Sequence, residues 1–400
     1  MNIRKAFKFL LMPNGEQASK MQQFCGCARF VFNKALGWQN TQYNADNTFK
    51  FRYTKIANLL PAWKEEHVWL SECHSQVLQQ SLKDLEASFM NFFQNRANFP
   101  KFKKKGVKDS FRFPQGFKLD EANSRVYLPK IGWMRYRKSR SVLGAVKNMT
   151  VSKTSGKWFV SIQTEYTIEQ PQPVGGEVGI DLGIVRFATL SDGSYYKPLN
   201  QFKRLSGQLK KAQQSLSRKT KYSQNWNKAK HRVSTIHHHI ANARKDYLHK
   251  ISTYISKNHA MVYVEDLQVS NLSKSAKGDV VNHGNKVKQK SGLNRSILDQ
   301  GWFEFRRQLD YKLAWRGGFL VSVPPKNTSR RCPCCNHVSG ENRKTQDIFL
   351  CQQCSFTANA DEVGAINILR AGHAQLACEV NGAVMPSAAG THRSELVSHH

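Results

Sequence analysis

Acidic residues are scarce in this chain of 400 residues. There are 28 Asp and Glu residues against 61 Lys and Arg residues, which gives a formal net charge of +33 and an isoelectric point of about 10.0. So large an excess of one sign repels itself unless a polyanion neutralises it. The composition therefore predicts nucleic acid as the partner, with an anionic membrane surface as the alternative.

Long apolar runs are also absent. No run approaches the roughly 18 apolar residues that a transmembrane helix requires. The apolar stretch 9–12 is too short for the core of a secretory signal and is followed by Pro13. The nine cysteines are an odd number, so we expect free thiols and a reducing compartment, the cytoplasm. Hydrophobic residues make up 40% of a chain whose basic residues are spread throughout, which predicts a folded protein that binds nucleic acid and no membrane.

Four of the cysteines have the spacing of a zinc site. They form the pattern C-x₂-C-x₁₅-C-x₂-C through Cys332, Cys335, Cys351 and Cys354. Each C-x₂-C turn offers two thiolates to one side of a tetrahedral Zn²⁺ ion. Cys334 is a surplus thiol that could compete for the ion, and four unrelated buried cysteines are the alternative interpretation. The spacing favours one structural zinc ion.

Three acidic residues lie where a nuclease would need them. Asp181 and Glu265 each end a short apolar run that is typical of a buried strand, and Asp361 precedes a small, apolar stretch that is typical of a packed helix. Cleavage of a phosphodiester by two Mg²⁺ ions requires converging carboxylates, because Mg²⁺ prefers oxygen ligands. Glycines on both sides of Asp181 would let a phosphate backbone approach. A purely structural role is the alternative for each acid alone, and we expect Asp266 and Glu362 either to be structural or to support their neighbours.

Basic and aromatic residues alternate in the segment 99–113. We expect phosphate contacts from Lys101, Lys103, Lys104, Lys105 and Arg112. The aromatic rings in the segment would either stack on bases or anchor a strand: Phe102, Phe111 and Phe113. A solvated run of charge is the alternative.

Hydrophobic periodicity predicts the main elements. The predicted strands cover 3–11, 125–128, 132–136, 146–153, 157–166, 261–264 and 319–323, and those between 117 and 166 are expected to form a small β-barrel. The predicted helices cover 17–36 and 75–93, two basic arms within 202–257, and one helix that carries Leu298, Trp302, Phe305, Leu309 and Leu313. Residues 170–173 are expected to be a linker and 273–294 a loop.

Several motifs, in order along the chain, closely resemble the TnpB family of transposon-encoded proteins. They are Arg29-Phe30-Val31-Phe32-Asn33, Gly179-Ile180-Asp181-Leu182-Gly183, Val264-Glu265-Asp266-Leu267, Thr328-Ser329-x-x-Cys332-x-x-Cys335, Asn359-Ala360-Asp361-x-x-Gly364-Ala365-Ile366-Asn367-Ile368 and Arg370-Ala371-Gly372-His373. The chain departs from the family pattern in two motifs. Many relatives have Asp-x-Asn-Ala-Ala where this chain has Asp361-Glu362-Val363-Gly364-Ala365, and many have Gly after the second zinc cysteine, where it has Asn336.

The resemblance implies an α+β multidomain protein. Its nuclease domain would be RuvC-like, of RNase H type (173–327 and 357–377), with a zinc-ribbon insert at 328–356. A β-barrel wedge domain (1–15 and 106–172) with a helical recognition insert (16–105) would precede it. The composition of the end of the chain, rich in small and polar residues without periodicity, separately predicts a disordered tail at 378–400. The implied activity is RNA-guided DNA cleavage beside a short transposon-associated motif, with guide RNA from the transposon end and double-stranded target DNA as partners, and a monomer as the expected state.

Two other functions remain open at this stage. A transposase that performs strand transfer would use the same acids with a 3′-hydroxyl as the nucleophile. A non-catalytic regulator of transposition would bind nucleic acid without cutting it, although the intact set of acids disfavours that role. The residues by themselves lead to a metal-dependent nuclease, and the RNA guide rests on the resemblance.

Overall fold

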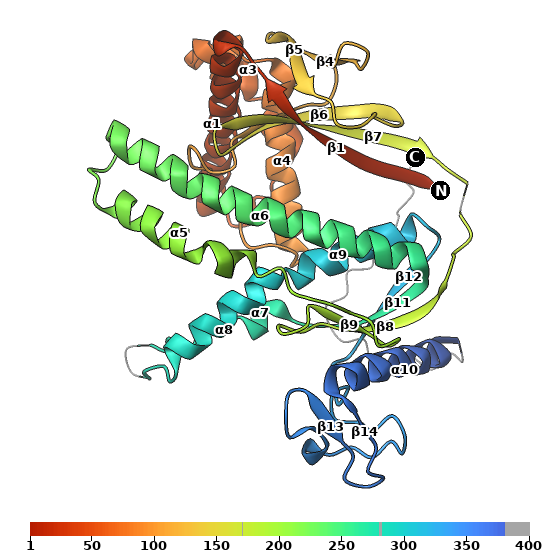
Figure 1. Cartoon of the computed structure of the whole chain (residues 1–400). Helices are drawn as coiled ribbons and strands as arrows, with labels where there is room; N and C mark the ends of the chain where they lie inside the picture. The colour runs from red at the N-terminus through yellow and green to blue at the C-terminus, as the bar shows by residue number, and fades with distance from the viewer. Residues whose placement is uncertain (170, 280–281, 381–400) are drawn as a thin grey trace. The chain divides into compact units, whose positions relative to one another are not determined.

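Two compact units make up the chain, Met1–Glu169 and Gln170–His400, and the boundary falls beside the predicted linker (Figure 1). The computed structural model describes residues 1–169, 171–279 and 282–380, with the side chains of 379 and 380 excepted. Each unit is described by itself below. None of the helices in these described ranges has both the length and the apolarity to span a lipid bilayer.

An antiparallel sheet of seven strands forms the base of the first unit. Its strands are β1 (Asn2–Met12), β2 (Ser110–Phe113), β3 (Lys118–Asp120), β4 (Arg125–Leu128), β5 (Gly132–Arg137), β6 (Ala145–Thr154) and β7 (Lys157–Thr167), in the order β2-β6-β7-β1-β5-β4-β3. The predicted strands are confirmed to within a residue or two at each end. The expected barrel is open, because β2 and β3 are edge strands and no pairing joins them in the described sheet.

Helices cover this sheet and complete its core. They are α1 (Gly15–Ala45), α2 (Tyr53–Ala57), α3 (Leu60–Glu66), the 3₁₀ helix η1 (Val68–Glu72) and α4 (Ser75–Phe93). A capping box fixes the start of α1, since the Asn14 side chain accepts from the Gln17 backbone N–H and the Gln17 side chain accepts in return. The apolar faces of α1 and α4 share one hydrophobic cluster with the sheet, which confirms that their predicted apolar stripes are core.

The second unit is built on a mixed sheet of five strands. The strands are β8 (Gly176–Asp181), β9 (Ala188–Leu190), β10 (Tyr195–Tyr196), β11 (His259–Glu265) and β12 (Phe319–Val323), in the order β10-β9-β8-β11-β12. The central pairs β8–β11 and β11–β12 are parallel. Two parallel neighbours end at the same edge of a sheet, so the carboxyl ends of β8 and β11 present Asp181 and Glu265 side by side.

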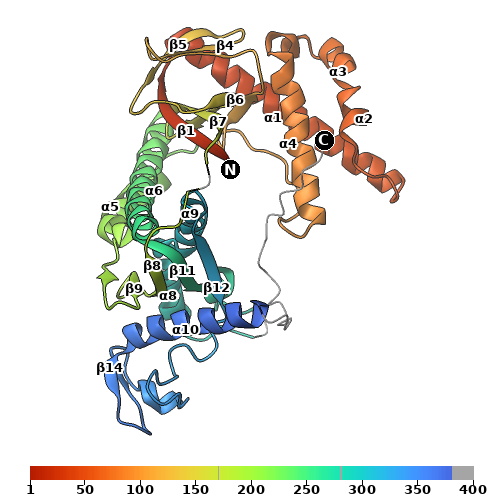
Figure 2. The ribbon, with the colours of Figure 1, turned by 90° about the vertical axis from the view of Figure 1, so that its right-hand side faces the viewer.

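Helices cover both faces of this sheet. They are α5 (Gln201–Ser217), α6 (Gln224–Asn258), α7 (Val269–Leu272), α8 (Val287–Gln300), α9 (Trp302–Ala314) and α10 (Ala360–Val380). Val262 and Val264 share a cluster with residues of α6 and α9, whereas Tyr263 packs with Ile368 of α10. This period of two along β11 places α10 opposite α6 and α9, as Figure 2 shows.

Three predictions for this unit need correction. Residues 287–294 belong to α8 and not to a loop, since the helix begins at Val287. The single predicted helix is two helices, because the chain breaks at Gly301 with φ 74, and Leu298 is exposed on the first of them. Helix α10 continues to Val380, so 378–380 are helical. The rest of the predicted tail, and Gln170 of the linker, lie outside the described residues.

Candidate active site and zinc-binding cluster

The three predicted acids converge at one end of the second sheet. Asp181 ends β8, Glu265 ends the neighbouring β11, and Asp361 lies in the first turn of α10. Their proximity shows in their electrostatics: burial, followed by the charges of Glu265 and Asp361, raises the pKa of Asp181 to about 7. Burial also raises the pKa of Glu265 above its ordinary value, although a hydrogen bond from Thr328 opposes that rise. Carboxylates that repel one another in a half-buried site favour a bound cation, because its charge offsets the repulsion.

Helix α10 lies directly against β8. A Cβ added to Gly179 would come 2.2 Å from the carbonyl oxygen of Ala365, so the glycine before Asp181 serves close helix packing. The predicted use of that glycine, to admit a phosphate backbone, is therefore wrong. Gly364 faces the site itself, because a Cβ there would lie 2.9 Å from Oδ2 of Asp181. The alanine of many relatives would crowd this carboxylate, and the glycine leaves it room.

The start of α10 is held by its own cap. The Asn359 side chain accepts hydrogen bonds from the backbone N–H groups of Asp361, at 3.1 Å, and Glu362, at 3.3 Å. A carboxylate in the first turn is also favoured by the partial positive charge of a helix N-terminus. Glu362 pairs with Arg186 at 3.5 Å, and Asp266 pairs with Arg306 at 2.5 Å. These two neighbouring acids are thus bound to arginine partners of their own, as a structural role requires.

Three site residues carry no signal that singled them out in the sequence. Arg343 donates to Asp361 at 3.0 Å, and its charge opposes the rise in the pKa of Asp181. The Thr328 hydroxyl donates to the Glu265 carboxylate. The Asn367 side chain donates to the backbone carbonyls of Thr328 and Arg331, both at 2.8 Å, and so fastens that segment to α10. Thr328 and Asn367 lie within the family motifs, but neither motif reveals which partner each contacts.

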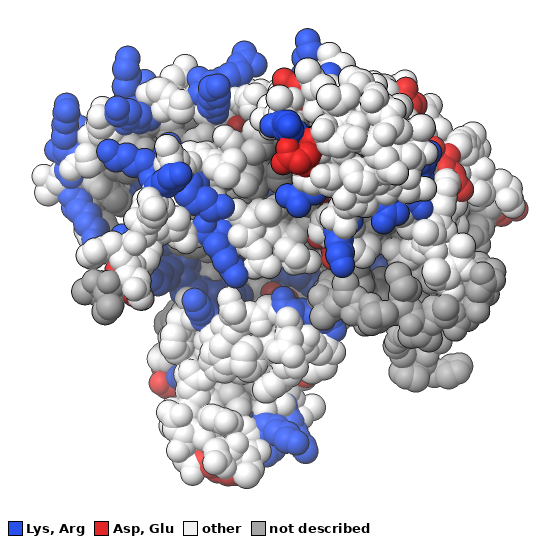
Figure 3. All heavy atoms as spheres, turned by 90° about the horizontal axis from the view of Figure 1, so that it is seen from below, with Lys and Arg blue, Asp and Glu red and all other residues white. Residues whose placement is uncertain are grey.

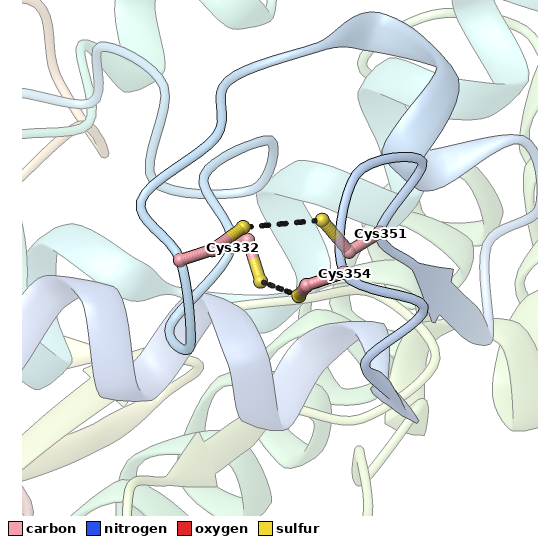
Figure 4. A group of neighbouring side chains, drawn as sticks. Cys332, Cys351 and Cys354 are labelled. Atoms are coloured by element: carbon pink, nitrogen blue, oxygen red, sulfur yellow. Dashed lines mark hydrogen bonds between the residues drawn. The ribbon is translucent and has the colours of Figure 1, made fainter.

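The four predicted zinc ligands form one compact cluster (Figure 4). All four Sγ atoms lie within 4.8 Å of one another, with 3.6 Å between Cys332 and Cys354 and 3.5 Å between Cys335 and Cys351. A tetrahedral zinc ion with Zn–S bonds of about 2.3 Å separates its sulfurs by about 3.8 Å. The cluster is therefore compatible with one structural zinc ion. All nine cysteines are free, and Cys334 is exposed and outside the cluster.

Each half of the cluster is a tight turn followed by a left-handed residue. Backbone N–H groups donate to Sγ of Cys332 and of Cys351, both at 3.4 Å. Asn336, with φ 61, and Ser355, with φ 56, follow the two turns. This conformation explains the glycine of many relatives at position 336, and asparagine tolerates it better than most residues.

A buried asparagine connects the zinc-binding segment to the acids. The Asn342 side chain donates to the carbonyls of Arg330 and His337 at 3.0 and 3.2 Å, and it accepts from the backbone N–H of Gln352 at 3.0 Å. It thereby joins the two halves of the cluster. Arg343 follows Asn342 directly in the chain. Because Asn342 is anchored, it also fixes the position from which the Arg343 guanidinium contacts the Asp361 carboxylate.

The residues of the predicted nucleic-acid segment lie in the first unit and divide into two groups. Lys101, Phe102, Lys104 and Lys105 are exposed, whereas Phe111 and Phe113 of β2 are only 4% and 0% exposed. Of the two alternatives for these two phenylalanines, their burial in the core matches the strand anchor. The Lys103 ammonium lies 3.8 Å from the centre of the Phe32 ring, and Arg112 lies 3.6 Å from the Asp84 carboxylate.

The raised pKa of Asp181 leads to a prediction about stability. A carboxyl whose pKa is higher in the folded state than its ordinary 3.8 stabilises the fold as a neutral group, and this contribution is lost as the pH rises through about 7. We expect Asp181→Asn to raise the free energy of unfolding less at pH 5 than at pH 8, where the gain over the wild type should reach about 1–3 kcal/mol, since solvent access reduces the full effect. Thermal unfolding without added Mg²⁺ measures the difference.

The matched control for this measurement is Asp246→Asn, which changes an exposed acid on α6. It should show the same pH dependence as the wild type. If Asp181→Asn and Asp246→Asn shift the unfolding midpoint equally at both pH values, the carboxylates do not destabilise one another as described.

Comparisons with known proteins agree on the family. Residues 157–276 match the IS605 OrfB family model, described as "Probable transposase", and residues 1–48 match its "Helix-turn-helix domain" model. Residues 302–368 match a "Cas12f1-like, TNB domain" model.

Curated relatives cover nearly the whole chain. The chain is 55% identical over 381 residues to the "Putative RNA-guided DNA endonuclease InsQ" of Escherichia coli (strain K12), with 94% of both chains covered. It is 34% identical to a "Putative RNA-guided DNA endonuclease" of Streptomyces pristinaespiralis, covering 94% of this chain and 91% of the relative. Among solved structures, the chain resembles a Cas12f1–sgRNA–target DNA complex with a TM-score of 0.54 at 14% identity, covering 92% of this chain and 98% of the other. At that identity the likeness concerns the fold.

Proposed function

Because the chain belongs to the IS605 OrfB family, the TnpB family of the predicted resemblance, we propose that it is an RNA-guided DNA endonuclease that hydrolyses phosphodiester bonds at Asp181, Glu265 and Asp361. The observation that carries the proposal is the convergence of these acids at one sheet edge in a chain with a net charge of +33. The mixed five-stranded sheet with helices on both faces supports the RuvC-like assignment of this unit, and the open seven-stranded sheet with its helices supports the wedge and recognition assignment of the other.

We propose that the three carboxylates hold Mg²⁺. When bound, the metal supplies an activated water and neutralises charge on the phosphate. The carboxylates support that role because the charges of Glu265 and Asp361 act on Asp181, and hard oxygen ligands suit Mg²⁺. In the described part of the chain, the four cysteines are the group whose ligand atoms already lie within 4.8 Å of one another, so the three acids would have to close around the metal. The residues around them act on the carboxylates: Thr328 orients Glu265 through its hydrogen bond, and Arg343 holds Asp361 by a charge-assisted one.

We also propose that the cysteine cluster holds one structural Zn²⁺ ion. Four thiolates at tetrahedral spacing are the ligands that zinc prefers, and no position is left open for a substrate. The ion would tie the two turns together and keep Asn342 and Arg343 in place. Its role in this proposal is to order the segment that reaches the acids.

The proposed partners are a guide RNA and a DNA duplex. Both are polyanions, which suits a chain with 33 more basic than acidic residues. In such a complex base pairing reads the target, while the protein contacts backbone and shape. We place this activity in the cytoplasm, at the DNA of the cell.

Purification and a cutting assay test the proposed function. The protein is expected to leave cells with a bound RNA of defined sequence, and in Mg²⁺ it should cut a DNA duplex that matches the guide portion of that RNA. Joined strands among the products would favour a strand-transfer transposase instead. Absence of bound RNA, together with no cutting when a guide is added, would refute the RNA-guided function.

The exposed lysines of the nucleic-acid segment lead to a second prediction. Changing Lys101, Lys104 and Lys105 to Gln should weaken nucleic-acid binding and flatten the slope of log affinity against log salt by about 2–3. Each lysine that contacts a phosphate releases a condensed counterion, and the variant no longer releases these ions. The choice of target sequence should not change, since phosphate contacts carry no base information. Filter binding at several salt concentrations measures the slope.

The control is Lys20→Gln, since Lys20 is already paired with Glu16 at 2.8 Å on α1. It should leave the slope nearly as it is in the wild type. An unchanged slope in the triple variant would mean that the segment 101–105 is a solvated surface.

A further inference from the structure

The hairpin of α5 and α6 has an almost uniform charge. Residues 201–258 contain fourteen Lys or Arg residues and one acidic residue, Asp246. Their basic side chains project from the surface at the upper left of Figure 3, where this hairpin lies. This excess of positive charge does not stabilise the two helices, because like charges on neighbouring turns repel each other. The hairpin is therefore suited to a polyanion.

Two aromatic rings stand at the tip of this hairpin. Tyr222 lies in the turn between the helices and is 74% exposed, and Trp226 lies in the first turn of α6. Their ring centres are 5.6 Å apart, and neither belongs to a hydrophobic cluster of the described residues. Large rings outside any core indicate a binding surface more than a packing element.

The turn holds Tyr222 in an uncommon conformation. Its φ is 71, in the left-handed region that bulky side chains rarely adopt. The Ser223 backbone N–H donates to Thr220 at 3.1 Å, and the Asn227 side chain donates to the carbonyl of Tyr222 at 3.4 Å. The Ser223 side chain accepts from the backbone N–H of Trp226 at 3.1 Å, which fixes the second ring at the helix start. The two rings are thus placed by the backbone of the turn.

Positive charge surrounds the two rings. The Lys221 ammonium lies 5.1 Å from the centre of the Tyr222 ring, and the Lys230 ammonium lies 5.1 Å from that of Trp226. One to three turns back along α5, a hollow of about 340 Å³ is lined by Lys211, Gln214, Ser215, Arg218 and Lys219. Aromatic faces beside a row of cations are the combination that binds unpaired nucleotides, with bases on the rings and phosphates on the lysines.

We propose that the tip of the α5–α6 hairpin is a binding site for an unpaired segment of RNA, with a base stacked on Tyr222 or Trp226 and the adjoining phosphates in the hollow of α5. This proposal rests on the proposed function, since it assigns a site to the guide RNA. Helix α6 has 35 residues and is about 50 Å long, and its far end leads into β11, whose seven residues up to Glu265 span only about 23 Å, less than half the length of the helix. A nucleotide at the tip is therefore remote from the bond that is cut, which favours the RNA scaffold over the cleaved DNA as the occupant.

A double variant, Tyr222→Leu with Trp226→Leu, tests the site. Leucine keeps apolar bulk at both positions and removes the faces on which a base stacks. Affinity for a transcript of the co-purifying RNA should fall about tenfold or more, because one stacked base contributes on the order of 1–3 kcal/mol. The matched control is Tyr254→Leu, a tyrosine on the same helix that is 60% exposed, and it should leave affinity unchanged. Circular dichroism confirms that the helices of each variant are intact.

A second variant covers the case in which the double variant does not fold. Lys211→Gln, Arg218→Gln and Lys219→Gln together should weaken RNA binding and reduce its salt dependence. Ultraviolet crosslinking of the wild-type complex should join RNA to a peptide that contains Tyr222 or Trp226. These results would support the site.

Failure of this inference and failure of the proposed function would give different results. If the wild type retains its RNA, but the variants bind it equally well and no crosslink maps to the tip, the inference is wrong and the proposed function stands. If the variants lose affinity for a single-stranded DNA oligonucleotide and keep it for RNA, the assignment to RNA is wrong. If the wild type binds no RNA at all, the proposed function itself fails.

Discussion

Asp181→Ala is expected to abolish Mg²⁺-dependent DNA cutting while the protein still binds its RNA and its target. Asp181 ends β8, and the charges of both other acids contribute to the rise in its pKa after burial. Removal of this carboxylate would remove one of the three proposed metal ligands. A loss of about 4 kcal/mol in transition-state stabilisation corresponds to roughly a 10³-fold lower rate. Single-turnover cutting of a matched duplex measures the rate, and a mobility shift measures binding.

Two matched variants complete this experiment. Glu265→Gln and Asp361→Asn should behave like Asp181→Ala, since each removes a carboxylate charge from the same cluster. Asp246→Asn changes an exposed acid on α6 and should cut at the wild-type rate. If Asp181→Ala cuts DNA at the wild-type rate, the assignment of these acids as the active site is wrong.

Cys351→Ser should remove the zinc ion, whereas Cys334→Ser should keep it. Cys351 is buried in the cluster and Cys334 is exposed outside it. A structural zinc site contributes on the order of 10–16 kcal/mol of metal binding to local folding, so loss of one thiolate should leave the segment disordered. Metal analysis by mass spectrometry should find about one zinc per chain in the Cys334 variant and almost none in the Cys351 variant.

Loss of zinc should also lower cutting. Asn342 joins both halves of the cluster, and the adjacent Arg343 contacts Asp361 at 3.0 Å. A disordered segment would release both contacts and the Thr328–Glu265 hydrogen bond beside them. RNA retention should be much less affected, since the proposed RNA contacts lie elsewhere. Zinc retained by Cys351→Ser, or zinc lost by Cys334→Ser, would show that the predicted ligand set is wrong.

Local patterns predicted most of the elements. Helix α4 and strands β4 and β12 have the predicted bounds, because a regular apolar stripe determines both the element and the face that it buries. The failures concern a segment whose pattern is weak, at the start of α8, and a break at Gly301 that a regular pattern does not reveal. Helix α8 begins in a basic, glycine-containing stretch, and only Ile297 and Gln300 of its residues are buried. Closure of the first sheet was not predictable either, since it depends on whether two distant edge strands meet.

The sequence alone determined the chemistry of this protein: four thiols at zinc spacing, carboxylates at the ends of apolar runs, and a charge that requires a polyanion. These features follow from residue type and local spacing. The tertiary structure decided which groups meet. It brought Arg343 to Asp361 and Thr328 to Glu265 across 18 and 63 positions of the chain, and it turned Phe111 and Phe113 into the core. Contacts of this kind depend on how strands and helices pack, because packing determines which face of each element is buried and which distant residues it meets.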